Sequence, residues 1–260
     1  MENKNLLQRA INGDIKAFQQ LFLEFQPQLK SYLYRLLTDR HDVEDLSQDT
    51  FVKAFDKIAT FKGNSSLKTW VFQIGTNLAY DFLKRRKCWM ADAQDKSKAL
   101  ALSSPDIVEK FVGVHQTSPY GRYDLTEHID FCFTCVSKTL SIEQQVALIL
   151  KDIYEFSRKE IAQVLNKTEG VVKHLLFDSR KLMIEIFDHR CALINKNGVC
   201  HQCTELAGIY NPKQTQQEEL LKIKMIKEAD NEDRRSLYEM RAQLVSNIDP
   251  LRSTGADLQD

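Results

Sequence analysis

The fold can be read from one acidic stretch, Asp42-Val43-Glu44-Asp45-Leu46-Ser47-Gln48-Asp49-Thr50-Phe51. Its apolar residues, continued by Phe55 and Ile58, are spaced as on one side of an α-helix. The polar groups of the opposite, exposed side are Asp42, Asp45, Gln48 and Asp49. The stretch therefore predicts an amphipathic helix with an acidic outer face.

The next segment combines a polar loop with a helix that ends in cations. The loop reads Phe61-Lys62-Gly63-Asn64-Ser65-Ser66-Leu67, and the helix carries Trp70, Val71, Ile74, Leu78 and Phe82 before Lys84-Arg85-Arg86-Lys87. Polar groups suit the edges of unpaired bases, and cations suit the backbone. With the acidic helix, this pattern is typical of a module that docks on a protein and holds nucleic acid. Read alone, the four cations are an ordinary solvated helix end.

The remainder also predicts an all-α protein. An apolar stripe from Ile15 to Leu36 has helical spacing, interrupted at Pro27. Residues 89–126 contain Ser-Pro turns and no sustained stripe, which is typical of a linker. Nothing in the first half of the chain sustains the period of two of a β-strand.

A helix-turn-helix is predicted between Ser157 and Met183. A short helix with Ile161 and Leu165 meets the polar turn Asn166-Lys167-Thr168, and a longer helix follows. Capping boxes are predicted ahead of the apolar runs, at Ser141 with Gln144 and at Ser157 with Glu160. Antiparallel helix pairs in plain helical bundles have a similar pattern, so this unit alone does not distinguish a helix-turn-helix from a bundle.

These motifs, in this order, resemble the extracytoplasmic-function (ECF) group of bacterial sigma factors. The resemblance implies two helical domains: sigma region 2 at residues 1–88 and sigma region 4 at residues 127–187, joined by the linker at 89–126. A Cys-rich segment and a charged helical tail follow at residues 188–260. The implied function is that of a non-enzymatic subunit that binds RNA polymerase core and directs promoter recognition and transcription initiation. Promoter DNA is the second implied partner, and an anti-sigma factor is a further candidate.

The resemblance also assigns roles to individual residues. Reading of the −10 element falls on Asn64, Ser65, Ser66 and Asn77, and phosphate contacts fall on Lys68, Lys84, Arg85 and Arg86. Trp70 lies in the apolar stripe, so we expect it in the core and not as a stacking platform. The polymerase contact falls on the acidic face with Asp42, Asp45, Gln48 and Asp49. Without the family match, an ordinary solvated face is the better interpretation of that helix.

The second helix of the helix-turn-helix departs from the family pattern. The groups able to reach bases or phosphates are Lys173, His174, Arg180 and Lys181. The helix continues as Leu175-Leu176-Phe177-Asp178 where the family usually carries more cations. Fewer donors and an added acid predict weak contact with the −35 element, or help from another protein.

The cysteines form a second departure. Cys132-Phe133-Thr134-Cys135 and Cys200-His201-Gln202-Cys203 are both CxxC pairs, which predicts one structural zinc held by Cys132, Cys135, Cys200 and Cys203. His128 and Cys191 are substitute ligands, and the segment from His128 to Cys135 resembles zinc-binding anti-sigma factors. A redox pair is the other chemistry that the two CxxC motifs allow, and simple packing, which we expect for Cys88, is the remaining interpretation.

Composition limits the remaining possibilities. Lys plus Arg and Asp plus Glu both number 36, so a nucleic-acid surface has to be a local patch. The sequence lacks a signal-peptide pattern and any run of about 18 apolar residues, so we expect a soluble, cytoplasmic protein. Two rivals remain: a thiol oxidoreductase, which the lack of βαβ patterning disfavours, and a zinc-dependent or redox-sensing regulator on a sigma fold with weakened promoter binding. Helical spacing between Gln216 and Ile248 fits a tail that folds back, one that binds a partner, or an exposed, frayed helix.

Overall fold

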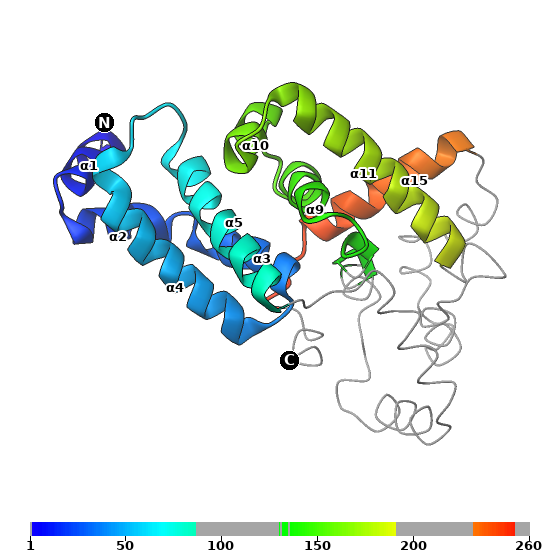
Figure 1. Ribbon diagram of the computed structural model, residues 1–260, viewed down its shortest axis with the longest axis horizontal. Coiled ribbons are helices and arrows are strands. Elements are labelled where there is room, and N and C mark those ends of the chain that lie inside the picture. The colour runs from blue at the N-terminus through cyan, green and yellow to red at the C-terminus, as the bar shows by residue number, and fades with distance from the viewer. Residues whose placement is uncertain (1, 87–129, 131, 135, 191–230, 253–260) are drawn as a thin grey trace, which may run out of the picture. The chain divides into compact units, whose positions relative to one another are not determined.

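The computed structural model describes residues 2–86, 130, 132–134, 136–190 and 231–252 (Figure 1). These residues form helices and no strand, as the sequence predicts. They divide into two compact units. The first contains residues 2–86, 141–176 and 249–252, and the second contains the described residues of 130–140 and 177–248. No helix in these ranges is both long and apolar enough to cross a membrane.

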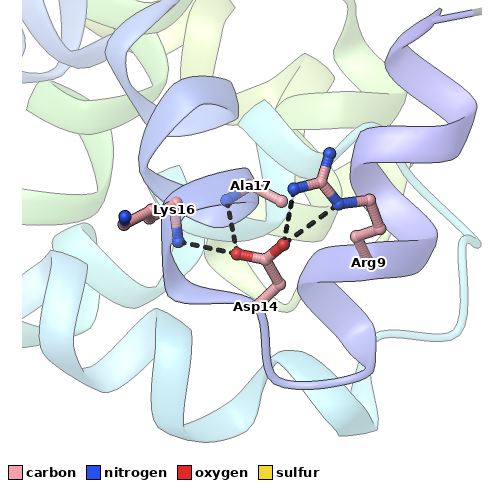
Figure 2. A network of polar contacts seen from close by, with 4 residues as sticks. All are labelled: Arg9, Asp14, Lys16 and Ala17. Carbon is pink, nitrogen blue, oxygen red and sulfur yellow. Dashed lines mark hydrogen bonds and ion pairs between the residues drawn. The ribbon is translucent and has the colours of Figure 1, made fainter.

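The first unit begins with two helices joined by a tight corner, α1 (Glu2–Ile11) and α2 (Ile15–Leu23). Asp14 caps α2, because one carboxylate oxygen accepts from the backbone N–H groups of Lys16 at 3.0 Å and Ala17 at 3.1 Å. Its other oxygen accepts two bonds from Arg9, at 2.7 and 3.0 Å (Figure 2). These bonds lower the pKa of Asp14, the Ala17 N–H most of all. One side chain thus fixes the angle between α1 and α2.

The predicted stripe from Ile15 to Leu36 forms two helices. α2 ends at Leu23, and α3 (Gln26–Leu37) starts with Pro27 in its first turn. Proline has no N–H to donate, so it suits a first turn and breaks a helix interior. α3 ends at Leu37 and is capped by Thr38, which adopts the left-handed conformation (φ 60°).

The acidic stretch forms α4 (Arg40–Lys57), which starts at the cap Asp39 and continues into the short 3₁₀ helix η1 (Ile58–Thr60). Its buried side packs on α2 through an aromatic cluster. Phe18 lies 5.2 Å from Phe51 and 5.6 Å from Phe55, and Phe22 lies 5.1 Å from Phe51, between ring centroids. Each buried Phe contributes about 1.5–3 kcal/mol of burial free energy. Packing of this side leaves the acidic side of α4 exposed.

Helix α5 (Leu67–Arg86) completes this bundle and packs against α3 and α4 (Figure 1). Gly75 allows the close approach, because a Cβ at this position would lie 3.2 Å from Leu29 Cδ1 and 3.3 Å from Thr50 Oγ1. The buried hydroxyls of Tyr32 and Thr76 share a hydrogen bond of 2.8 Å between α3 and α5.

The helix-turn-helix lies in the carboxyl half. α9 (Ile142–Leu148) runs directly into the π-helical turn η2 (Ile149–Ile153), in which the Tyr154 N–H donates to the carbonyl of Ile149, five residues back. α10 (Arg158–Leu165) and α11 (Glu169–Arg190) follow, joined by a turn with Asn166 in the left-handed region (φ 53°). Both predicted capping boxes are present, at Ser141 and at Ser157. α11 contributes residues up to Leu176 to the first unit and later residues to the second.

The second unit has its own buried residues. Phe133 packs on Tyr238 with ring centroids 6.2 Å apart, and Tyr238, Ala242 and Val245 of α15 (Asn231–Ser246) are buried. The described part of the tail is therefore a packed helix and not an exposed one. The apolar positions predicted before residue 231 lie outside the described residues.

Candidate nucleic-acid interface

The predicted base-reading loop leads directly into the first turn of α5. Gly63 adopts φ 72°, a conformation that side-chain-bearing residues rarely take. Asn64 and Ser66 are exposed, and Ser65 is half-buried. The Ser66 hydroxyl accepts from the Thr69 N–H at 3.0 Å, so Ser66 caps α5 in addition to its predicted role. The loop thus presents polar side chains from a fixed helix start.

The outer surface of α5 continues this polar strip. Asn77 is exposed, and so are Lys84 and Arg85 about two turns later. Arg85 Nε donates to the main-chain carbonyl of Asp81 at 3.1 Å, which holds this side chain along the helix. The side chain of Arg86 is not among those that the structure describes. The structure therefore brings the predicted base readers and two of the predicted phosphate contacts onto one helix and its leading loop.

Lys68 differs from the other predicted phosphate contacts. Its ammonium Nζ lies 4.8 Å from the centroid of the Phe156 ring and 5.8 Å from that of Phe72. Partial burial lowers the pKa of Lys68, and nearby Glu160 opposes this by raising it. Lys68 is therefore engaged by aromatic rings in this conformation.

The helix-turn-helix contacts the same strip through α10. Gln163 Nε2 donates to the main-chain carbonyl of Asn64 at 3.1 Å, and Gln73 Nε2 donates to that of Gln163 at 2.9 Å. The buried Thr69 hydroxyl donates to Glu160 Oε1 at 3.2 Å. The pKa of Glu160 is lowered, first by the Ser157 hydroxyl and further by Thr69 and Lys68. Sequence reasoning missed Gln73 and Gln163, because polar residues on helix surfaces have no spacing signal of their own.

The acidic face of α4 is laid out as predicted. Asp45, Gln48 and Asp49 are exposed, and Asp42 is half-buried in the first turn. Val52 lies one turn further along the same face and is 50% exposed. This apolar residue beside the acids was missed by sequence reasoning, although its spacing from Gln48 and Asp49 could have placed it there.

The second helix of the helix-turn-helix exposes a mixed surface. Val172, Leu176, Ser179 and Met183 are buried, whereas Lys173, His174 and Lys181 are exposed and Arg180 is half-buried. Phe177 is 68% exposed and Asp178 is exposed beside it. As predicted, the middle of this helix exposes few cations to solvent, because Phe177 and Asp178 occupy its exposed side.

Comparison with known proteins matches this architecture in the same order. The family "Sigma-70 region 2" matches residues 21–88, and "Sigma-70, region 4" matches residues 131–183. The RNA polymerase sigma-H factor of Pseudomonas aeruginosa is 26% identical over 180 residues, covering 69% of this chain and 91% of that protein. The ECF RNA polymerase sigma factor SigW of Bacillus subtilis is 26% identical over 184 residues, covering 69% and 94%.

The chain is an ECF-type sigma factor. A solved structure of CnrH in complex with the cytosolic domain of CnrY has the same fold, with a TM-score of 0.51 at 19% identity. The match between the two covers 72% of this chain and 98% of the solved chain. In this sigma factor, the region 2 match contains the end of α2 and all of α3, α4 and α5, and the region 4 match contains α10 and most of α11.

Most cysteines of this ECF-type sigma factor lie outside the residues that the structure describes. Cys132 is half-buried. Cys135, Cys200 and Cys203 are outside, as are the substitute ligands His128 and Cys191 and also Cys88, which belongs to neither CxxC pair. Among the residues that are described, no three His, Cys, Asp or Glu side chains gather as a metal site would require. The zinc site therefore stays a prediction.

Proposed function

We propose that this sigma factor reads the −10 element with the loop at Asn64–Ser66 and with Asn77, while Lys84 and Arg85 hold the backbone. The exposed polar strip along the start and outer surface of α5 carries this proposal. Unpaired bases need hydrogen-bonding groups at their edges, and phosphates need cations nearby. As a sigma factor, the chain binds RNA polymerase core and directs it to promoters.

We propose that the acidic face of α4 is the surface that binds the polymerase. Its exposed acids suit a partner with cations, and Val52 adds an apolar contact at one end. Region 4 would then read the −35 element through Lys173, His174, Arg180 and Lys181. Since the exposed Asp178 repels phosphates, we expect this second contact to contribute less affinity than the first. By the same family resemblance, we place the sigma factor in the cytoplasm and propose an anti-sigma factor as a partner.

Run-off transcription tests the proposed function. Purified chain is mixed with core polymerase and genomic fragments, and the RNA 5′ ends are mapped. We expect initiation at defined positions that core polymerase alone does not use. Initiation at the same positions with and without the chain would refute promoter recognition by this protein.

The zinc proposal is a separate, structural one. It rests on the two CxxC pairs, whose spacing suits tetrahedral thiolate ligation. Metal binding would add folding free energy, and oxidation of either pair would release the metal. Metal analysis of protein purified without chelator should give one zinc per chain, and Cys200→Ser should lower both zinc content and thermal stability. Substoichiometric zinc, or unchanged stability of this variant, would refute the site.

A further inference from the structure

We propose that Asp178 of α11 selects promoters that carry a cytosine at one position of the −35 element. Its carboxylate accepts a hydrogen bond from the cytosine amine and disfavours the other three bases. The inference rests on the proposed function, in which region 4 reads this element with α11. It gives Asp178, which lowers the affinity for phosphates, a role in sequence preference.

Asp178 lies on the solvent-facing side of α11, which is one continuous helix (Figure 1). It is exposed, four residues after the exposed His174 and three residues before the exposed Lys181. Residues three and four apart lie on the same face of a helix. The stretch from Lys173 to Lys181 is about 12 Å long at 1.5 Å per residue, close to the major-groove width of about 12 Å. A helix placed in the groove by these basic residues therefore brings Asp178 to the base edges.

Asp178 has no structural task among the described residues, where its carboxylate forms neither a hydrogen bond nor an ion pair. Other acids of this chain hold helix starts. Asp14 accepts from the Ala17 N–H at 3.1 Å, and Asp39 accepts from the Asp42 N–H at 2.9 Å. Asp178 lies in the middle of α11, where the backbone N–H groups are already paired within the helix. Its carboxylate is therefore free to bind a group outside the protein.

The base edges of the major groove offer one good partner for this carboxylate. An ionised carboxylate can only accept hydrogen bonds. Guanine presents the acceptors N7 and O6, and thymine presents the acceptor O4. Adenine presents a donor with the acceptor N7 beside it, whereas cytosine presents its N4 amine with no acceptor beside it on the same base. Cytosine is therefore the base that suits Asp178.

Phe177 adds to the preference for a pyrimidine. Its ring is 68% exposed, directly before Asp178 in the sequence. In the major groove, an apolar side chain can contact the C5 edge of a pyrimidine, where thymine carries its methyl group. Arg or Lys in these places would instead favour guanine. The two residues together thus favour pyrimidines on the strand that they face.

Discrimination by Asp178 arises mainly from rejection of the wrong bases. At a promoter without this cytosine, the carboxylate loses water and gains no donor, and an unpaired charged group costs more than one hydrogen bond contributes. Removal of the carboxylate should therefore raise transcription from the wrong promoters more than from the right ones. A general repulsion between Asp178 and phosphates would affect all promoters alike.

A promoter library separates these two effects. The −10 element is kept constant, the −35 element is randomised, and full-length sigma factor with core polymerase transcribes the library, whose transcripts are counted by sequencing. The test variants are Asp178→Ala and Asp178→Arg. Glu185→Gln is the matched control, because it removes one negative charge at an exposed position two turns further along α11.

With the parent chain, we expect cytosine to be preferred over guanine at least about threefold at one −35 position. Asp178→Ala should bring this ratio close to one by raising the guanine promoters, and Asp178→Arg should reverse it at the same position, because Arg binds guanine. Glu185→Gln should keep the parent ratio. A parent ratio that persists in Asp178→Ala, or a ratio that Glu185→Gln changes equally, would overturn the inference.

The same data test the proposed function separately. Transcription that depends on the −35 sequence, but with the same base preferences in parent and Asp178→Ala, would refute only the role of Asp178. Transcription that is indifferent to every −35 substitution would refute reading of this element by region 4, and the inference with it.

Discussion

The Ser31 hydroxyl of α3 donates a hydrogen bond of 2.6 Å to Asp249, a residue 218 positions later in the chain. Ser31 is buried, and Arg40 at the start of α4 donates to the carbonyl of Leu251 at 3.3 Å. Residues 249–252 thus pack on region 2 even though the sigma domains precede them. This contact lies at the end of α4 that carries Asp42.

We expect Asp249→Ala to lower the free energy of unfolding by about 1–2 kcal/mol, because it leaves the buried Ser31 hydroxyl without its acceptor. Asp249→Asn keeps an acceptor oxygen and should lose less than half of that amount. Urea unfolding followed by circular dichroism measures both. Equal losses in the two variants would show that the charge of Asp249, and not the hydrogen bond, stabilises the contact.

Asn77→Ala and Arg85→Ala should separate base reading from phosphate binding. Asn77→Ala is expected to relax base preference at one position of the −10 element, since it removes a side chain that would bind a base edge. Arg85→Ala should weaken all promoters alike and lower the salt slope by about one. Transcription from a promoter library at several salt concentrations measures both. The same pattern of promoter loss in both variants would contradict these roles.

Replacing Asp45 and Gln48 together by Lys should raise the Kd for core polymerase at least about tenfold, because it would place like charges across the interface. The matched control is Gln19→Lys with Glu24→Lys, which makes the same charge change at exposed positions of the α2 region. Fluorescence anisotropy with labelled sigma factor measures the affinity. If the two double variants bind equally well, the acidic face of α4 is only a solvated surface.

The contact between Glu160 and Thr69 should weaken in acid. The pKa of Glu160 is lowered from its ordinary value of 4.5, first by the Ser157 hydroxyl. Its carboxylate therefore stabilises the folded state fully above that value, and the contribution is lost as the pH falls through the lowered pKa. We expect thermal stability to fall between about pH 5 and pH 3, and to fall less in Glu160→Gln, which keeps the capping box without titrating. Identical pH profiles would contradict this assignment.

Asp14→Ala should lower Tm by a few degrees, because the first turn of α2 loses its cap and Arg9 loses its acceptor. Asp14→Ser keeps an oxygen for the backbone N–H groups and should recover most of the loss. Differential scanning calorimetry measures the two variants. A serine variant as unstable as the alanine one would show that the ion pair with Arg9, and not the cap, holds this corner.

Local signals in the sequence predicted much of this fold. The capping boxes at Ser141 and Ser157 were found because a cap and its partner lie three residues apart. The helix α4 and its acidic face followed from spacing alone. Pro27 marked a break in the predicted stripe, although its place in the first turn of α3 shows that two helices form there.

Contacts between distant residues could not be predicted in the same way. The bond between Gln163 and Asn64 joins residues 99 positions apart, and neither side chain differs in pattern from a solvated one. The role of Ser66 as a cap was missed, because its hydroxyl was assigned wholly to base reading. The exposure of Phe177 was also missed, since sequence reasoning counted this residue only as a missing cation.

Because of the π-helical turn η2, the positions of Tyr154 and Phe156 depend on the number of residues between α9 and α10. Tyr154 and Phe156 close wide turns by donating to the carbonyls of Ile149 and Leu150, and Glu155 between them adopts φ 59°. A π turn holds one residue more than an α turn, so deleting one residue within 149–153 would let α9 continue as a regular helix. The residues that follow would then rotate by about 100° and leave the Phe72 side of α5. A single-codon deletion could therefore free region 4 from region 2 without changing any residue that forms the contact.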